Sequence, residues 1–197
     1  MNPYLRQDLQ HNWSRIARWY AANTPQGTLV LAEGASEDEI AELETALGLR
    51  LPDDLRHSLS LHNGAANEGY LLYHGELLST ARILELWQMY RDMQHNEGWG
   101  QGNDYQTDEL QGPIRPVYWD GLRIALTDNS GDAAMLDLQP AEGGQAGQII
   151  EFDGEVGPRT VLAPSFSAWI AQLADELEQG KHVYIEDAGC VAPPGTW

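Results

Sequence analysis

The segment from Ser36 to Gly64 constrains the fold most strongly, because it encodes two capped helices with almost no slack between them. Ser36 and Glu39 have the spacing of a capping box, and Gly48 follows the last apolar position of that helix. Pro52 suits the start of a second helix, where no amide hydrogen is needed. The sequence therefore predicts two short helices, each with one buried apolar face.

Apolar residues spaced three or four apart predict three further helices, at 4–20, 79–93 and 165–178. Beyond Pro113 apolar and polar residues alternate, which is typical of strands. The candidate strands are 117–119, 122–127, 133–137, 149–152 and 160–162, with an earlier strand at 28–31 and a small hairpin of 70–73 with 76–78.

This order of helices, a block of strands and one closing helix predicts an α+β fold. We expect the N-terminal helices and a C-terminal helix to pack on one side of a largely antiparallel or mixed sheet. A chain of 197 residues can bury such a core as one domain. The expected domain covers residues 1–180, and an acidic and then Pro-rich tail follows at 181–197.

Several motifs in a fixed order resemble those of the SUKH superfamily. They are Glu44, Leu47-Gly48, Leu51-Pro52 and His62-Asn63-Gly64, then Ile83 through Trp87, Trp119, Asp128, Gly131-Asp132, Asp137 and Gly147-Gln148-Ile149-Ile150. The resemblance covers roughly residues 13–178 and is nearest to the subgroup of fungal cell-wall-synthesis regulators and many bacterial homologues. It implies a binding protein. Bacterial members are commonly immunity proteins that neutralise a secreted toxin, often a nuclease, and fungal members are scaffolds in wall-integrity signalling.

Thirty acidic residues oppose eleven basic ones, which gives a formal net charge of −19. Binding to nucleic acid requires Lys and Arg to replace the counterions of the phosphates, so this balance argues against a DNA or RNA partner. The same charge attracts a basic protein and raises its rate of association. Acidity also supports solubility, so the charge alone leaves both interpretations open.

No apolar run approaches the ~18 residues of a membrane span, and the first residues lack the basic start and apolar stretch of a secretory signal. The single Cys190 excludes an internal disulfide. We therefore expect a cytoplasmic protein that does not insert into a membrane.

The sequence gives no support for catalysis, a metal or a cofactor. The six His residues share no three- or four-residue spacing on one helix, and Cys190 has no adjacent base. The Gly-rich run 98–102 lacks the flanking strand and helix of a phosphate-binding loop. The run 128–132 lacks the ligand spacing of a calcium loop and predicts a tight turn. We expect a protein that is not an enzyme and has no cofactor.

We expect partner contacts on the loops beside the sheet, including the Gly-rich loop at 95–113, because aromatic anchors ringed by polar residues dominate binding energy. The predicted contacts are Trp99, Asp104, Asp108, Trp119, Asp128 and Asp132. The primary functional prediction is an immunity protein that neutralises a cognate basic toxin by stoichiometric occlusion. The alternative is a regulatory scaffold in cell-wall or envelope control, and the oligomeric state is left open.

Overall fold

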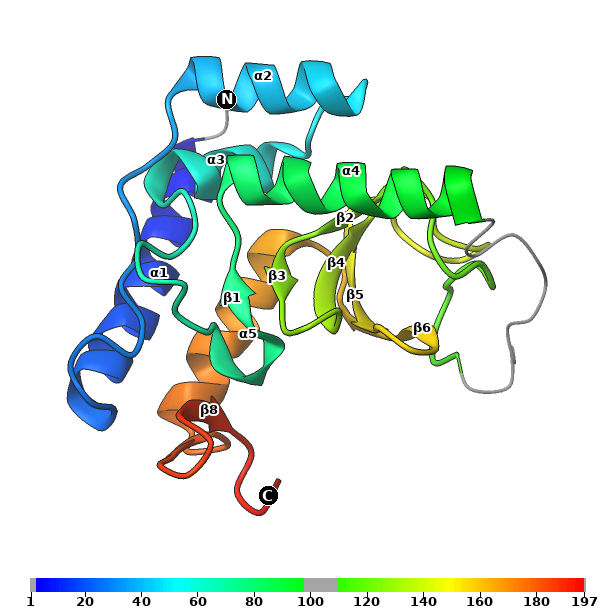
Figure 1. Ribbon diagram of the computed structural model, residues 1–197. Coiled ribbons are helices and arrows are strands. Elements are labelled where there is room, and N and C mark those ends of the chain that lie inside the picture. Colours follow the sequence, from blue (N-terminus) through cyan, green and yellow to red (C-terminus); the bar gives the residue numbers. More distant parts are fainter. Residues whose placement is uncertain (1–2, 98–109, 197) are drawn as a thin grey trace.

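The computed structural model describes residues 3–97 and 110–196, in which five helices lie above and to one side of a four-stranded antiparallel sheet (Figure 1). The helices are α1 (Pro3–Asn23), α2 (Glu37–Leu47), α3 (Asp53–Leu61), α4 (Thr80–Glu97) and α5 (Phe166–Glu178), with a 3₁₀ turn η1 (Leu72–His74). The strands are β1 (Glu76–Leu77), β2 (Arg123–Ala125), β3 (Thr127–Asp128), β4 (Ala133–Asp137), β5 (Gln148–Asp153), β6 (Gly157–Ala163), β7 (Val183–Ile185) and β8 (Cys190–Ala192).

The two-helix segment folds as its caps predict. The Ser36 hydroxyl accepts from the Glu39 amide while the Glu39 carboxylate accepts from the Ser36 amide, which confirms the capping box of α2. Glu44 then joins α2 to α3, because its carboxylate accepts a 2.8 Å hydrogen bond from the Leu51 amide and also pairs with Arg56. Glu44 therefore holds the connection between the two helices in place.

The main sheet has four antiparallel strands in the order β2-β4-β5-β6. All five residues of β4 are buried, so both faces of this strand are covered. β3 follows β2 closely along the chain and pairs with β1 in a separate two-stranded ladder. The end of β3 therefore lies next to the segment that contains η1 and β1.

The helices cover the sheet in two groups. α5 packs on β5 and β6, and α1 and α3 pack in turn on α5. α4 contacts β2 and carries α2 on its other side, and Figure 1 shows both helices lying above the strands. Tyr90 of α4 meets Phe152 of β5 edge-on, with 5.9 Å between ring centroids. These contacts confirm the predicted α+β fold.

The predicted strand at 117–119 is wrong, because these residues are irregular. The guanidinium of Arg123 is fully buried and donates to the carbonyl oxygens of Arg115, Val117 and Tyr118. Those carbonyl groups therefore bind a side chain instead of a neighbouring strand. The predicted strand at 28–31 is likewise reduced to one bridge, between Leu31 and Ala65.

The predicted hairpin at 70–78 forms only in part, because η1 replaces its first strand. Leu72 has φ 54°, and its amide donates a 2.8 Å hydrogen bond to the Tyr20 hydroxyl. Gly75 has φ 101°, and a Cβ there would lie 2.2 Å from the carbonyl oxygen of Asp128. The backbone at Gly75 is thus pressed directly against the end of β3.

The segment that the sequence describes only as a tail adds a hairpin. β7 and β8 pair antiparallel, all three residues of β8 are buried, and β8 contacts η1. Within the described ranges, none of the helices is both long and apolar enough to cross a membrane.

Candidate protein-binding site

Residues 128–132 connect β3 to β4 and form the predicted tight turn. Asn129 and Asp132 exchange backbone hydrogen bonds, and Asp128 Oδ1 accepts a 3.1 Å bond from the Gly131 amide. Ser130 and Gly131 have φ values of 58° and 105°, so the turn needs residues that tolerate the left-handed region. The turn fixes two carboxylates, at Asp128 and Asp132, close together on one corner of the protein.

One arginine side chain forms ion pairs with three carboxylates beside this turn. Arg82 of α4 lies 2.5 Å from Glu85, 3.8 Å from Glu76 and 3.9 Å from Asp128. Burial raises the pKa of Glu76, and the positive charge of Arg82 offsets this only in part. Negative charge is therefore in excess, and we call Glu76, Glu85, Asp128 and Asp132 the acidic corner.

A groove of about 340 Å³ opens between η1 and the neighbouring ends of β4, β5 and β6. We call it the η1 groove, and its lining residues are Tyr73, His74, Asp132, Ala133, Glu151, Phe152, Asp153 and Arg159. Asp132 belongs to both surfaces, and its Oδ1 accepts a 2.9 Å hydrogen bond from the Gly154 amide. The acidic corner and the η1 groove are therefore continuous.

Glu151 is the half-buried carboxyl of the groove. Burial raises its pKa, Arg159 lowers it, and the negative charges of Asp132 and Asp153 raise it further. Desolvation and the negative neighbours both disfavour the charged form of this carboxyl group. An approaching cation therefore stabilises its carboxylate more than it would stabilise an exposed one.

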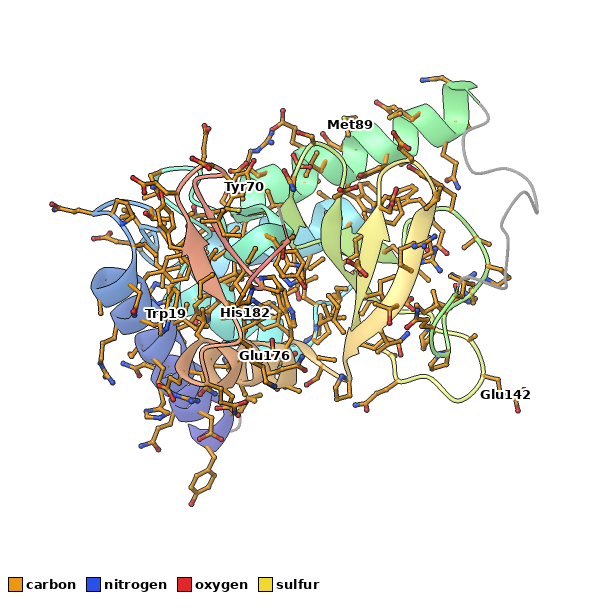
Figure 2. All side chains as sticks on the ribbon, turned by 90° about the horizontal axis from the view of Figure 1, so that it is seen from below. Trp19, Tyr70, Met89, Glu142, Glu176 and His182 are labelled. Atoms are coloured by element: carbon orange, nitrogen blue, oxygen red, sulfur yellow. The ribbon has the colours of Figure 1, made fainter. Side chains whose placement is uncertain are left out.

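His74 lines the groove and belongs to an aromatic cluster in its wall. Its ring centroid is 4.3 Å from that of Tyr73 and 5.5 Å from that of Trp169. Burial, followed by the nearby His182, lowers the pKa of His74 to about 4, although Glu176 acts in the opposite direction. His182 Nε2 lies 3.1 Å from Glu176 Oε2, and Figure 2 shows His182 next to Glu176 of α5.

Of the six residues predicted to contact a partner, the structure brings Asp128 and Asp132 together at the acidic corner. Asp132 is exposed, and Asp128 is half-buried. The positions of Trp99, Asp104 and Asp108 lie outside the described residues.

Trp119, the remaining predicted contact, is an internal side chain with 3% exposure. Its Nε1 donates a 3.0 Å hydrogen bond to the Arg123 carbonyl, and its ring stacks on Tyr90 with 5.6 Å between centroids. In this conformation the indole supports the core, and a partner at the surface would have to contact other groups.

The η1 groove was not predicted as a site from the sequence. Its side chains come from η1, the turn before β4, β5 and β6, which are far apart along the chain. Glu151 gave the one local signal, as an acidic residue inside an otherwise apolar strand. Among residues 3–97 and 110–196, no group of three or more His, Cys, Asp or Glu side chains is placed to hold a metal ion.

Comparison with known proteins gives a family match over most of the chain. The model of the SMI1/KNR4 family (SUKH-1) matches residues 34–172. A glucan synthesis regulatory protein of Neurospora crassa is 26% identical over 89% of this chain and 40% of its own length. A cell wall biosynthesis and cell cycle regulator of Schizosaccharomyces pombe is 29% identical over 93% of this chain and 39% of its own length.

A cell wall assembly regulator of Saccharomyces cerevisiae is 22% identical over 89% of this chain and 41% of its own length. The chain thus spans about two fifths of the length of these relatives. They contradict the primary functional prediction, because all three are named as regulators of the cell wall or of glucan synthesis, and the toxin-immunity prediction is wrong. The motif residue Glu44 illustrates why the prediction failed. Its contacts hold two helices together, so its presence indicates the fold and not the kind of partner.

Proposed function

The chain belongs to the SMI1/KNR4 family (SUKH-1), and we propose that it is a regulatory scaffold that binds other proteins in cell-wall control. The observation that carries this proposal is the match of about nine tenths of the chain to fungal wall regulators. Since the chain covers about two fifths of those proteins, the proposal concerns the binding function of this part of them.

The acidic corner supports a basic protein as the partner. Its carboxylates at Glu76, Glu85 and Asp128 share one guanidinium, that of Arg82. The net charge of −19 opposes binding to nucleic acid and favours rapid association with a positively charged protein surface. The same surface repels acidic proteins, so it would also contribute to the choice of partner.

The proposed role consists of binding and release in the cytoplasm, without a catalytic step. A scaffold of this kind presents a fixed surface to several endogenous proteins. The turn 128–132 suits this task, because its backbone and side-chain hydrogen bonds hold Asp128 and Asp132 in place before a partner arrives.

Deletion of the coding sequence in the native organism tests the proposal. We expect the deleted cells to become sensitive to a wall-binding dye and to osmotic lysis, and the wild-type chain to restore resistance. Unchanged wall properties in the deleted cells, under conditions in which a known wall-synthesis mutant is affected, would contradict it.

A further inference from the structure

The η1 groove has an unbalanced charge. Among the described residues that line it, three carry carboxylates, Asp132, Glu151 and Asp153, and one carries a guanidinium, Arg159. Because Glu151 is half-buried, a cation that entered beside it would be attracted through a less polar medium than at an exposed carboxylate. The groove therefore favours a positively charged ligand.

His74 gives a second and independent indication of a ligand. It is 7% exposed and lines the groove, yet its ring nitrogens have no hydrogen-bond partner within residues 3–97 and 110–196. Neither nitrogen is among the fully enclosed atoms without a partner in this part of the chain, so both are accessible. A ligand in the η1 groove could therefore form a hydrogen bond with His74.

The state of His74 also suits a cationic ligand. Burial lowers the pKa of His74 to about 4, so the imidazole is uncharged near pH 7 and does not repel a cation. A neutral imidazole carries one nitrogen that accepts a hydrogen bond. The Tyr73 ring lies 4.3 Å from it, centroid to centroid, and adds an aromatic surface to the same wall of the groove.

We propose that the η1 groove binds an arginine side chain presented by a partner protein. Glu151 pairs with the guanidinium, the Tyr73 ring packs against its plane, and His74 accepts a hydrogen bond from it. Arginine fits these groups better than lysine, because its planar guanidinium pairs with carboxylates through two donors and stacks on aromatic rings. This assignment rests on the proposed function, since it gives the protein partner a specific contact.

Substitution of Arg159 should change the affinity for arginine in the opposite direction to substitution of Glu151. Arg159 lies in the same groove, and its charge already lowers the pKa of Glu151. An incoming guanidinium must therefore share Glu151 with Arg159. Removal of the Arg159 charge strengthens arginine binding, whereas removal of the Glu151 charge weakens it.

The experiment is a nuclear magnetic resonance titration of the full chain at physiological salt. The probe is the peptide acetyl-Gly-Ser-Gly-Arg-Gly-Ser-Gly-amide, compared with versions that carry lysine or the neutral isostere citrulline. We expect the arginine peptide to shift the amide signals of Tyr73, His74 and Glu151 in a saturable way. The citrulline peptide should leave them unchanged, and the lysine peptide should bind more weakly.

Two pairs of variants distinguish binding in the η1 groove from binding to the acidic surface of the chain as a whole. Glu151→Gln should lower the affinity for the arginine peptide about fivefold. Glu42→Gln, on the exposed face of α2, should change this affinity less than about twofold. Arg159→Gln should strengthen binding several-fold, and Arg50→Gln, at a side chain 75% exposed, should not.

Shifts scattered over the acidic surface, equal losses in Glu151→Gln and Glu42→Gln, equal binding of lysine and arginine peptides, or no saturable shift would each overturn the proposal. These outcomes are independent of the wall phenotype of deleted cells. A deleted strain with a wall defect, together with a groove that binds no arginine, would leave the scaffold role standing and remove only this site.

Discussion

Glu76 of β1 and Asp128 of β3 lie directly opposite each other in an antiparallel ladder, and the guanidinium of Arg82 lies 3.8 Å and 3.9 Å from their carboxylates. Like charges at facing positions of a sheet repel each other. Arg82 therefore stabilises a pairing that the two acidic side chains alone would weaken. It also leaves the acidic corner with more negative than positive charge, which the proposed binding surface requires.

Arg82→Gln should lower the free energy of unfolding by roughly 0.5 to 1 kcal/mol, a modest value because Arg82 is 38% exposed and its ion pairs are screened. Urea denaturation measures the change, with Arg50→Gln as the control for loss of one exposed positive charge. Adding Asp128→Asn to Arg82→Gln should recover part of the loss, since it removes the repulsion and keeps an oxygen for the Gly131 amide. If the free energy of unfolding does not recover in the double variant, Arg82 does not stabilise the protein by offsetting the repulsion between Glu76 and Asp128.

Gly75→Ala should be severely destabilising, by about 3 kcal/mol or more, because the new Cβ would lie 2.2 Å from the Asp128 carbonyl oxygen at a φ of 101°. Gly143→Ala is the matched control, with φ 87° and no neighbour within 4 Å, and should cost about 1 kcal/mol for backbone strain alone. Thermal unfolding of both variants gives the comparison. Equal losses would mean that Gly75 does not hold η1 against β3.

Arg123→Met should lower the free energy of unfolding by about 3 to 5 kcal/mol. The variant keeps the length of the side chain but leaves the carbonyl groups of Arg115, Val117 and Tyr118 without their donor. Burial raises the pKa of Asp137, and the variant also removes the positive charge that partly offsets this rise. Arg6→Met, at an exposed position of α1, serves as the control. A loss in Arg123→Met no larger than in the control would contradict the role given to these hydrogen bonds.

His74 should make stability depend on pH. Its pKa in the folded protein is lowered to about 4, below the value of about 6.5 expected in the unfolded chain, so the unfolded state binds the proton first as the pH falls. Stability is therefore lost between about pH 6.5 and pH 4. From pH 7 to pH 5 the wild type should lose about 2 kcal/mol more than His74→Phe.

Urea denaturation at both pH values measures this difference. The other groups that face His74, namely Tyr73, His182 and Glu176, are present in both proteins, so their titration largely cancels in the comparison. His11→Phe, at an exposed position, should follow the wild type. Parallel losses in wild type and His74→Phe would show that His74 is not held neutral.

The sequence predicted those parts of the fold that depend on neighbours along the chain. The capping box of Ser36 and Glu39 and the turn at Asp128 lie within a few residues, so their hydrogen bonds follow from spacing alone. The segment before Arg123 could not be predicted in this way. Its carbonyl groups accept hydrogen bonds from a buried guanidinium instead of from a neighbouring strand.

The candidate site was only partly predictable for a similar reason. Asp128 and Asp132 share one turn and were recognised from it, whereas Tyr73 and Glu151 meet only after η1 and the sheet have packed together. Trp119 shows a different limit, since a tryptophan before a polar turn gives no indication of which way its ring will point, and in the structure the ring is buried. The tail hairpin was missed because its apolar residues, Cys190 to Ala192, form a run too short to show a period.

The most direct test of a role in cell-wall control is the rate of labelled precursor incorporation into wall polymer, measured in cells that lack the native copy and carry one variant each. We expect an altered rate in the deleted cells, restored by the wild type and by Glu42→Lys but not by Asp132→Lys, which makes the same charge change at the acidic corner. Each chain must be present at equal level. A rate that is the same with and without the chain would contradict the assignment to cell-wall control.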